Sequence, residues 1–307
     1  MIELRQLHKE FRGRTAVESL DLTVPPGCIF GLLGHNGAGK STTIGMLLGQ
    51  VWPTSGTAAI GGYDVLRDRS RALSRVGAIF EAPVFYDYLS GWRNLEILTN
   101  YTAAVSRERM TEVLAWVGLE GRARSAVRTY SHGMKARLAL AQALLPHPEL
   151  LILDEPANGL DPEGIHELRQ TIRRLHAELR LTILLSSHQL AEVQQICSHV
   201  AILDRGRKMF DGPMSSALAA PEWVRLVTDD FPRAVASLID AGLIRESDAL
   251  HRIALAPGVG TAAVAHFLVT HGFSLQELTP LQATLEEFYL GLIKSHRASS
   301  RSHDSAS

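Results

Sequence analysis

The sequence predicts an α/β fold in which a central, mostly parallel sheet carries helices on its faces. Strand and helix patterns alternate from the start of the chain to about residue 210. Two continuous apolar runs, at 150–153 and 182–186, are typical of parallel strands that are buried on both faces. A glycine-rich segment at 34–42 lies between an apolar strand and a helix, and forms a strand–loop–helix unit.

The chain is predicted to begin with a strand. Residues 2–11 alternate partially between apolar and polar side chains, which favours a strand. The turn Val24-Pro25-Pro26-Gly27 then leads the chain into a short, buried strand at 28–33. Residues 42–48, which follow the glycine-rich segment, have the pattern of the first turns of a helix.

Two longer helices are expected farther along the chain. Residues 107–118 place apolar side chains on one helical face, and residues 163–179 repeat this pattern. The runs at 150–153 and 182–186 precede and follow the second helix, so the alternation of strand and helix continues.

The pattern changes near Gly212-Pro213, where we expect a domain boundary. Beyond it a βαββαβ-like order predicts a small α+β domain at 213–296 with a sheet of its own. Residues 297–307 are mostly Ser, Arg and Ala and are expected to be disordered. The expected strands of this domain are 224–227, 243–244, 252–255 and 274–278, and the expected helices are 232–241, 262–271 and 285–294.

The composition is that of an ordinary soluble globular protein of 307 residues, with 46% hydrophobic and 21% charged residues. Its 31 basic and 32 acidic residues leave a net charge of −1, so no global basic field attracts nucleic acid. The start of the chain lacks the pattern of a signal peptide, and no apolar stretch approaches the roughly 20 residues of a membrane span. We therefore expect a soluble, cytoplasmic protein in which Cys28 and Cys197 are buried and reduced.

The glycine-rich segment fits the phosphate-loop pattern G-x-x-x-x-G-K-[ST] without a mismatch. Its glycines allow backbone N–H groups to turn toward phosphate oxygens, and the helix start adds its positive dipole end. Lys40 can then reach the β- and γ-phosphates, while the hydroxyl of Ser41 can ligate Mg²⁺. The alternative is a glycine-rich turn that ends in Lys-Ser by chance, but the flanking strand and helix favour a nucleotide site. The predicted nucleotide-binding residues are Gly34, His35, Asn36, Gly37, Ala38, Gly39, Lys40, Ser41 and Thr42.

Two acids, Asp154 and Glu155, directly follow the apolar run 150–153. An acid at the end of a buried strand in such a fold can hold the Mg²⁺ shell, which suits Asp154. Glu155 is well placed to take a proton from an attacking water. Strand ends also carry acids for solubility alone, but the phosphate loop upstream favours the catalytic interpretation.

A third segment, Tyr130-Ser131-His132-Gly133-Met134-Lys135, precedes a helical, apolar run at 136–145. A small hydroxyl residue and a glycine before a helix make an anion-receptive start, where backbone N–H groups and Ser131 can face a phosphate. Taken alone this is only a helix cap, and its position upstream of Asp154 makes it informative.

Isolated histidines such as His147, and the imidazole of His35, are interpreted as surface or loop side chains rather than ligands.

Together these segments closely resemble the nucleotide-binding subunit of ATP-binding-cassette (ABC) transporters over roughly residues 1–215. Residues 34–42 resemble the Walker A loop, and residues 150–155 resemble Walker B with its catalytic glutamate. Residues 130–134 are similar to the signature Leu-Ser-Gly-Gly-Gln. Single residues that match the family's motifs are Ser131 and Gly133 in the signature, Asp161 in the D-loop, His188 in the switch segment, and Phe11 where an aromatic ring, usually Tyr, stacks on adenine.

Two departures from the family's pattern concern Glu81 and the signature. Glu81 stands where the family usually has Gln; its carboxylate can still approach Mg²⁺, but it adds negative charge beside the phosphates. The alternatives are an inactivating change and a functional variant, and with residues 83–86 the variant resembles the subgroup that exports or confers immunity to bacitracin, lantibiotics and related antibiotics. In the signature, His132 and Met134 replace Gly and Gln, while the residues expected nearest the phosphate remain. We expect an active site.

The resemblance implies a P-loop NTPase (ABC ATPase) domain at 1–212. This domain would include an N-terminal antiparallel β portion and a helical subdomain at about 88–145. The resemblance also implies ATP and Mg²⁺ as cofactors, with Ser41, Glu81 and Asp154 as metal ligands. Glu155 would be the base and His188 the contact to the γ-phosphate.

In the family, the signature of one subunit completes the ATP site of another, so a head-to-tail homodimer, or a dimer with a paralogue, is implied. An integral membrane permease encoded separately would be the second partner, and the loop from Glu81 to about Asn94 would dock on it. The subunit would then lie on the inner face of the membrane through the permease. The alternatives are a soluble ABC ATPase that acts on nucleic acid or ribosomes, and an assembly scaffold with a silent nucleotide site. Long coiled coils, a second cassette and a basic stripe, which would favour action on nucleic acid or ribosomes, are absent from the sequence.

Overall fold

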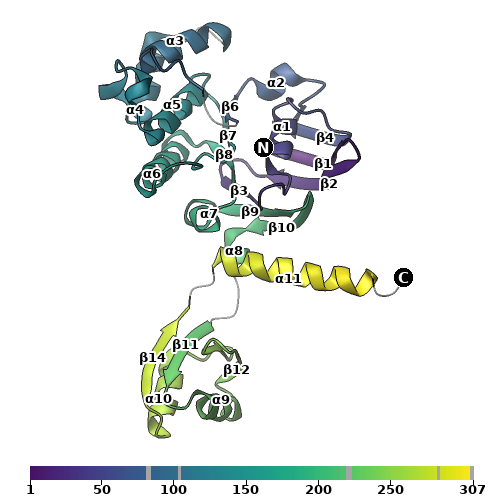
Figure 1. The fold of residues 1–307 in the computed structure, drawn as a ribbon, viewed down its shortest axis with the longest axis vertical. Coiled ribbons are helices and arrows are strands. Elements are labelled where there is room, and N and C mark those ends of the chain that lie inside the picture. The colour runs from purple at the N-terminus through teal and green to yellow at the C-terminus, as the bar shows by residue number, and fades with distance from the viewer. Residues whose placement is uncertain (81–83, 103–104, 219–222, 282–283, 305–307) are drawn as a thin grey trace. The chain divides into compact units, whose positions relative to one another are not determined.

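The structure is a computed structural model that describes residues 1–80, 84–102, 105–218, 223–281 and 284–304. The chain divides into two compact units, Met1–Met214 and Ser215–Ser307 (Figure 1). The boundary expected near Gly212-Pro213 lies close to this division.

The first unit is organised by a six-stranded sheet with the strand order β10-β9-β3-β8-β7-β6. The strands from β9 to β6 run parallel, and β10 joins the edge antiparallel to β9. Every residue of β3, β7 and β8 is buried, as the continuous apolar runs predict. The mostly parallel central sheet is therefore confirmed. The strands are β3 (Ile29–Leu33), β6 (Val76–Ile79), β7 (Leu150–Leu153), β8 (Thr182–Ser187), β9 (His199–Asp204) and β10 (Arg207–Pro213).

The N-terminal residues form a second, antiparallel sheet with the order β2-β1-β4-β5. Side chains of this sheet, such as Ile2, Leu22 and Ile60, share one core with Phe30 and Leu32 of β3. The predicted antiparallel β portion is confirmed. Its strands are β1 (Ile2–Phe11), β2 (Arg14–Val24), β4 (Ser55–Ile60) and β5 (Tyr63–Asp64).

Helices flank the central sheet. In the view of Figure 1, α3, α4 and α5 gather on one side of this sheet, and α1 and the antiparallel sheet lie on the other. The ion pair Arg137–Glu167, at 3.2 Å, links α5 to α6. The predicted helical subdomain thus consists of the three helices α3–α5 and two short 3₁₀ turns. The helices of the first unit are α1 (Lys40–Leu47), α2 (Arg69–Leu73), α3 (Gly91–Thr102), α4 (Arg107–Trp116), α5 (His132–Leu144), α6 (Pro162–Leu179) and α7 (Leu190–Ile196), with α8 (Met214–Ala217) at its boundary.

The second unit has the βαββαβ order expected from the sequence. Its antiparallel sheet, with the order β12-β13-β11-β14, packs on its helices around a core of its own that contains Leu226, Leu238 and Leu268. Its elements are β11 (Trp223–Thr228), α9 (Phe231–Asp240), β12 (Ile244–Ser247), β13 (Arg252–Leu255), α10 (Thr261–Thr270), β14 (Leu275–Pro280) and α11 (Leu285–Asp304).

The closing helix α11 is longer than the sequence predicts. Its start is fixed by a reciprocal cap, in which the Glu287 N–H donates to Thr284 Oγ1 at 3.2 Å and the Thr284 N–H donates to Glu287 Oε2 at 3.4 Å. Residues 297–304, for which the sequence predicts disorder, continue this helix. Once a helix has begun, each added residue gains a backbone hydrogen bond, and Arg and Ala are favourable helix residues. Residues 305–307 lie outside the described residues.

Both cysteines are buried and free, as predicted. Burial raises the pKa of the Cys28 and Cys197 thiols, so neither is a ready nucleophile. None of the described helices has both the length and the apolar character needed to cross a bilayer.

Candidate nucleotide site

The phosphate loop connects β3 to α1 and has the backbone that its glycines allow. Gly37 and Gly39 lie in the left-handed region, with φ of 83° and 105°. A Cβ on Gly39 would stand 2.6 Å from the Ala16 carbonyl oxygen, so a larger residue does not fit there. The loop therefore packs directly against the β1–β2 hairpin before it enters α1 at Lys40.

Lys40 is the buried cation of the site, with 5% of its surface exposed. Its ammonium group donates to the Gly34 carbonyl at 2.7 Å and to the His35 carbonyl at 3.3 Å. It also forms an ion pair with Glu155 Oε1 at 3.1 Å. All three N–H groups of Lys40 are thus used, and a phosphate that binds Lys40 has to replace at least one of these partners.

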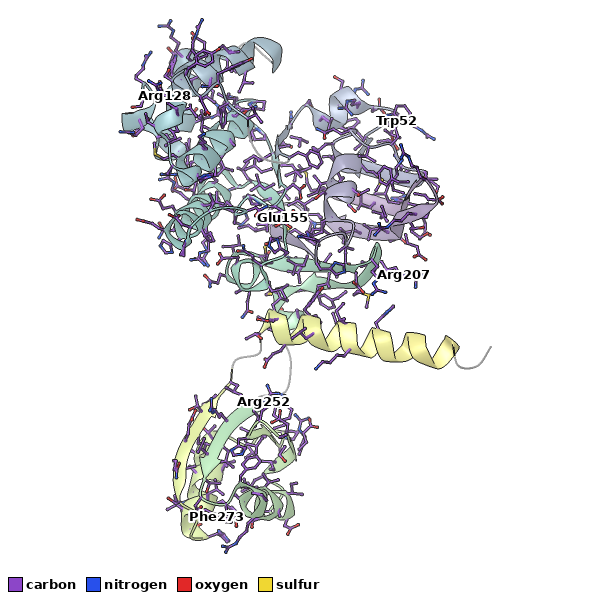
Figure 2. The ribbon with its side chains drawn as sticks, in the orientation of Figure 1. Trp52, Arg128, Glu155, Arg207, Arg252 and Phe273 are labelled. Carbon is purple, nitrogen blue, oxygen red and sulfur yellow. The ribbon has the colours of Figure 1, made fainter. Side chains whose placement is uncertain are left out.

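Glu155 is held between two other site residues. Its second carboxylate oxygen, Oε2, lies 2.8 Å from His188 Nδ1. Glu155 has a φ of 48°, which is uncommon for a residue with a side chain and is typical of functional positions. Figure 2 shows Glu155 in the middle of the first unit.

Ser186 connects the two acids that follow β7. The Glu155 N–H donates to Ser186 Oγ at 2.8 Å, and the Ser186 hydroxyl donates to Asp154 Oδ1. Asp154 is buried, with 7% exposure. One hydroxyl therefore fixes both the carboxylate of Asp154 and the backbone of Glu155.

The structure brings together Lys40, Asp154, Glu155 and His188, because β3, β8 and β7 are neighbours in the sheet and end at the same edge. Ser41 follows Lys40 in the first turn of α1, where it is exposed. Glu81 lies outside the described residues.

The other predicted site residues lie apart from this cluster. Phe11 is 47% exposed and has the Lys9 ammonium 4.7 Å from its ring centroid. Ser131 caps α5, accepting from the Met134 N–H at 3.2 Å, and Asp161 caps α6, accepting from the Gly164 N–H at 2.8 Å. Within the described ranges, no hydrogen bond or ion pair joins Phe11, Ser131, Gly133 or Asp161 to the Lys40 cluster.

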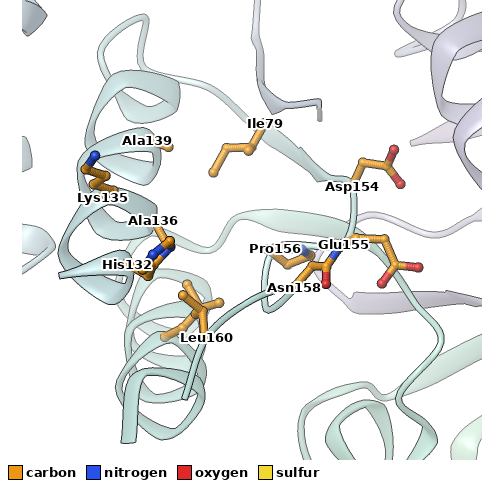
Figure 3. A pocket seen from close by; sticks show the side chains of 11 residues that line it. Ile79, His132, Lys135, Ala136, Ala139, Asp154, Glu155, Pro156, Asn158 and Leu160 are labelled. Atoms are coloured by element: carbon orange, nitrogen blue, oxygen red, sulfur yellow. The ribbon is translucent and has the colours of Figure 1, made fainter. Parts of the chain in front are cut away.

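A pocket of about 490 Å³ opens between the two acids and α5. Figure 3 shows Asp154 and Glu155 on one side of it and the α5 side chains on the other. Lys135 lines this pocket and also pairs with Asp87 at 3.0 Å. The start of α5 therefore faces the acids that follow β7 across an open space.

Sequence reasoning missed two residues that contact the site. The sequence prediction includes Ser186 only as the last residue of the run 182–186, although a polar residue at the end of a buried strand is a usable signal. Asp204 ends β9 in the same manner as Asp154 follows β7, and its Oδ1 lies 2.8 Å from His35 Nε2. The imidazole of His35, a half-exposed loop side chain, is therefore hydrogen-bonded to the end of β9.

The sequence of this chain is similar to the sequences of known proteins. The profile of the ABC transporter family matches residues 17–158. The bacitracin transport ATP-binding protein BcrA of Bacillus licheniformis is 43% identical over 213 residues, which cover 69% of this chain and 70% of that protein. The uncharacterized ABC transporter ATP-binding protein YcbN of Bacillus subtilis is 32% identical over 303 residues, which cover 97% of this chain and 99% of that protein. The chain belongs to the ABC transporter family.

A solved structure supports the same assignment. The ATP binding subunit of an ABC transporter superposes with a TM-score of 0.62 and 30% identity, covering 71% of this chain and 92% of that chain. The predicted ABC ATPase fold is confirmed. The chain is an ATP-binding and ATP-hydrolysing subunit of the ABC family, as the motifs predict.

Proposed function

We propose that this ABC ATPase dimerises on ATP and drives a separately encoded membrane permease that exports an antibiotic, drug or peptide. The bacitracin transport relative supports this substrate class. The protein would act on the cytoplasmic face of the membrane, attached through the permease.

The observation that carries the proposal is the linked set Lys40–Glu155–His188, with separations of 3.1 and 2.8 Å. When ATP binds, Lys40 exchanges Glu155 for phosphate oxygens, and the released carboxylate can accept the proton of the attacking water. His188, still beside Glu155, would contact the γ-phosphate. Lys40 then offsets the negative charge that develops on the transferred group.

The residues of the site fit Mg²⁺. The buried Asp154 carboxylate and the Ser41 hydroxyl offer oxygen ligands, which Mg²⁺ prefers, and Mg²⁺ usually needs only one or two carboxylates besides phosphates and water. When bound, the ion would neutralise phosphate charge. Glu81 is proposed as a further ligand or water contact on sequence grounds alone.

A second subunit would complete each site. Ser131 is exposed at the start of α5, and the helix offers free N–H groups and its positive end to a phosphate. Because Ser131 is not bonded to the Lys40 cluster of its own chain, we propose that it contacts ATP held by the partner. Gly133 and Asp161 would lie in the same interface, and Phe11 would stack on adenine.

The loop after Glu81 is the proposed contact to the permease. Val84, Tyr86 and Tyr88 are 89%, 50% and 73% exposed, although large apolar and aromatic side chains are usually buried. The buried Asn94 amide fixes the loop, since its Oδ1 accepts from the Tyr86 N–H at 2.8 Å and its Nδ2 donates to the Ser90 carbonyl at 3.0 Å. A fixed backbone with exposed aromatic rings suits docking on another protein.

The variant Glu155→Gln tests the proposal. It removes the base, so we expect steady-state ATP hydrolysis to fall by a factor of about 100 or more. The variant also loses the charge that holds Lys40, so ATP should bind at least as tightly and should leave a dimer visible by light scattering. Glu163→Gln, on the exposed first turn of α6, is the matched control and should behave as the wild type. Normal turnover in Glu155→Gln would contradict the role of Glu155, and a monomer with ATP would contradict the dimer.

A further inference from the structure

The side chain of His35 makes two hydrogen bonds that hold the phosphate loop from outside. Its Nδ1 lies 2.6 Å from the Asn36 carbonyl oxygen, and its Nε2 lies 2.8 Å from Asp204 Oδ1. The His35 side chain is 47% exposed, whereas that of Asp204 is only 11% exposed. The imidazole thus connects the loop backbone to a buried carboxylate.

Asp204 has little else to pair with. Within the part of the chain that the structure describes, His35 is the only hydrogen-bond partner of its carboxylate. A buried carboxylate without a partner is costly, because it has lost water and gained nothing in exchange. The pair is therefore not an incidental surface contact.

The loop also lies directly against the end of β9. A Cβ on Gly34 would stand 2.5 Å from the Leu203 carbonyl oxygen, and the Gly206 N–H donates to the Ala38 carbonyl at 3.0 Å. Asp204 sits between these two backbone contacts along the chain. The His35–Asp204 bond therefore adds a side-chain link to a surface that the loop backbone already touches.

Both partners of the imidazole are oxygen atoms that accept hydrogen bonds, the Asn36 carbonyl and the Asp204 carboxylate. A hydrogen bond to a carboxylate is charge-assisted, which makes it stronger than a bond between neutral groups. The His35 ring is therefore held more firmly by Asp204 than by a neutral partner.

The pair acts on Lys40 through the backbone. The carbonyl groups of Gly34 and His35 both accept from the Lys40 ammonium, at 2.7 and 3.3 Å. A side chain that fixes the position of His35 also fixes one of these carbonyl groups. It thereby sets where the ammonium stands before a phosphate arrives.

We propose that His35 and Asp204 are positioning residues that preset the phosphate loop for ATP. The pair contributes to nucleotide affinity and leaves the hydrolytic step to Glu155. The proposal rests on the ATP-binding role of the loop.

Steady-state ATPase assays of the full chain test the proposal through the division between KM and kcat. Asp204→Ala should raise the KM for ATP about tenfold, the loss of one hydrogen bond to a charged group, with kcat within about twofold. Asp204→Asn keeps an oxygen that accepts from Nε2–H and should restore most of the affinity. Asp211→Ala, in β10 of the same hairpin, loses the pair with Lys208 at 2.7 Å and should leave KM unchanged.

His35→Ala should be worse than Asp204→Ala, because it leaves the carboxylate buried and unpaired. The double variant His35→Ala/Asp204→Ala should then bind ATP better than His35→Ala alone.

An unchanged KM in Asp204→Ala, or a fall in kcat at constant KM as from partial unfolding, would overturn the proposal. If Asp204→Ala does not fold, the KM for ATP of His35→Ala is compared with that of the double variant. Equal KM values in these two variants would also overturn the proposal. Failure of the wild type to bind ATP would instead contradict the ATP-binding role itself.

Discussion

At the residue scale, the site depends on polar groups with two tasks each. Ser186 accepts from the Glu155 N–H and donates to Asp154, so a single hydroxyl orients the proposed base and the proposed Mg²⁺ ligand. Glu155 in turn holds Lys40 with one oxygen and faces His188 with the other. A substitution of Ser186 or of Glu155 therefore removes contacts to two neighbouring residues.

We predict that Ser186→Ala lowers kcat about tenfold, because a lost hydrogen bond to a buried charged group costs roughly 1.5–3 kcal/mol. The matched control is Ser187→Ala, because the Ser187 hydroxyl accepts from the Gln189 N–H at 2.9 Å and, among the described residues, has no hydrogen bond to either acid. An ATPase assay at saturating ATP and Mg²⁺ compares them. Equal kcat values in the two variants would show that Ser186 does not orient the acids.

At the scale of elements, two residues that match the family's motifs lie at the N-termini of helices. Ser131 and Asp161 are the N-caps of α5 and α6, each accepting from the N–H three residues ahead. The cap side chains thus have a structural task apart from any contact with nucleotide. Stability and activity have to be measured separately at these positions.

Asp161→Ala should lower the melting temperature by about 2–4 °C, since loss of an N-cap costs about 1 kcal/mol. Asp161→Asn keeps an oxygen that can accept from Gly164 and should melt close to the wild type. Asp68 is the control, because it stands at the N-cap of α2 without a side-chain cap bond, and Asp68→Ala should have little effect. Thermal unfolding followed by circular dichroism tests this, and equal losses at the two positions would contradict the capping role.

The edge of the antiparallel sheet is tied to β10 by a two-pronged ion pair. Arg207 Nε and Nη2 donate to the two Glu18 oxygens at 2.7 and 2.9 Å. Figure 2 labels Arg207, which begins β10. The hydrogen bond from Arg207 lowers the pKa of Glu18 below its ordinary value.

Because the pKa of Glu18 is lower in the folded state than in the unfolded state, the ion pair stabilises the protein when the pH is above the pKa of Glu18 in the unfolded state. This stabilisation is lost as the pH falls through the pKa of Glu18 in the folded state. Arg207→Gln should therefore lower the melting temperature at pH 7 slightly, because an exposed ion pair contributes little to stability. The difference from the wild type should shrink as the pH is lowered toward 3. Arg67→Gln, at an exposed position, serves as control, and a pH-independent difference in Arg207→Gln would contradict the assignment.

At the scale of the whole molecule, the first and the second unit each contain a hydrophobic core of their own among the described residues. The core of the second unit contains Leu226 and Leu238, both fully buried, and all its members come from residues 224–278. The core shared by the two sheets of the first unit ends at Leu203. Each unit can therefore lose its packing without removing the core of the other.

We predict that Leu226→Ala lowers the free energy of unfolding of the second unit by about 2–5 kcal/mol, and with it the temperature of one calorimetric transition. ATP should raise the temperature of the other transition only, which belongs to the first unit. Ile152→Ala, in the buried strand β7, should instead lower the transition that ATP raises. Val269→Ala, which is 62% exposed, should shift neither. Scanning calorimetry with and without ATP measures these shifts, and a single transition that moves in all variants would contradict the separation.

The sequence by itself determined the elements and the family. Strand and helix periodicity located β3, β7, β8 and the βαββαβ order after residue 213, because burial on one or both faces leaves a regular pattern of apolar residues. The phosphate loop, Asp154 and Glu155 were recognisable because their chemistry needs fixed residue types next to strand ends. The length of α11 was not, since a polar segment carries no burial pattern that distinguishes helix from disorder.

Only the tertiary structure decided which side chains meet. Lys40, Glu155 and His188 lie on three separate segments, and β3, β8 and β7 had to be neighbours before their ends could converge. The pairing of His35 with Asp204 spans 169 positions of the chain and depends on β9 lying beside β3. Local sequence patterns report the surroundings of one segment, whereas such contacts depend on the strand order, which no single segment encodes.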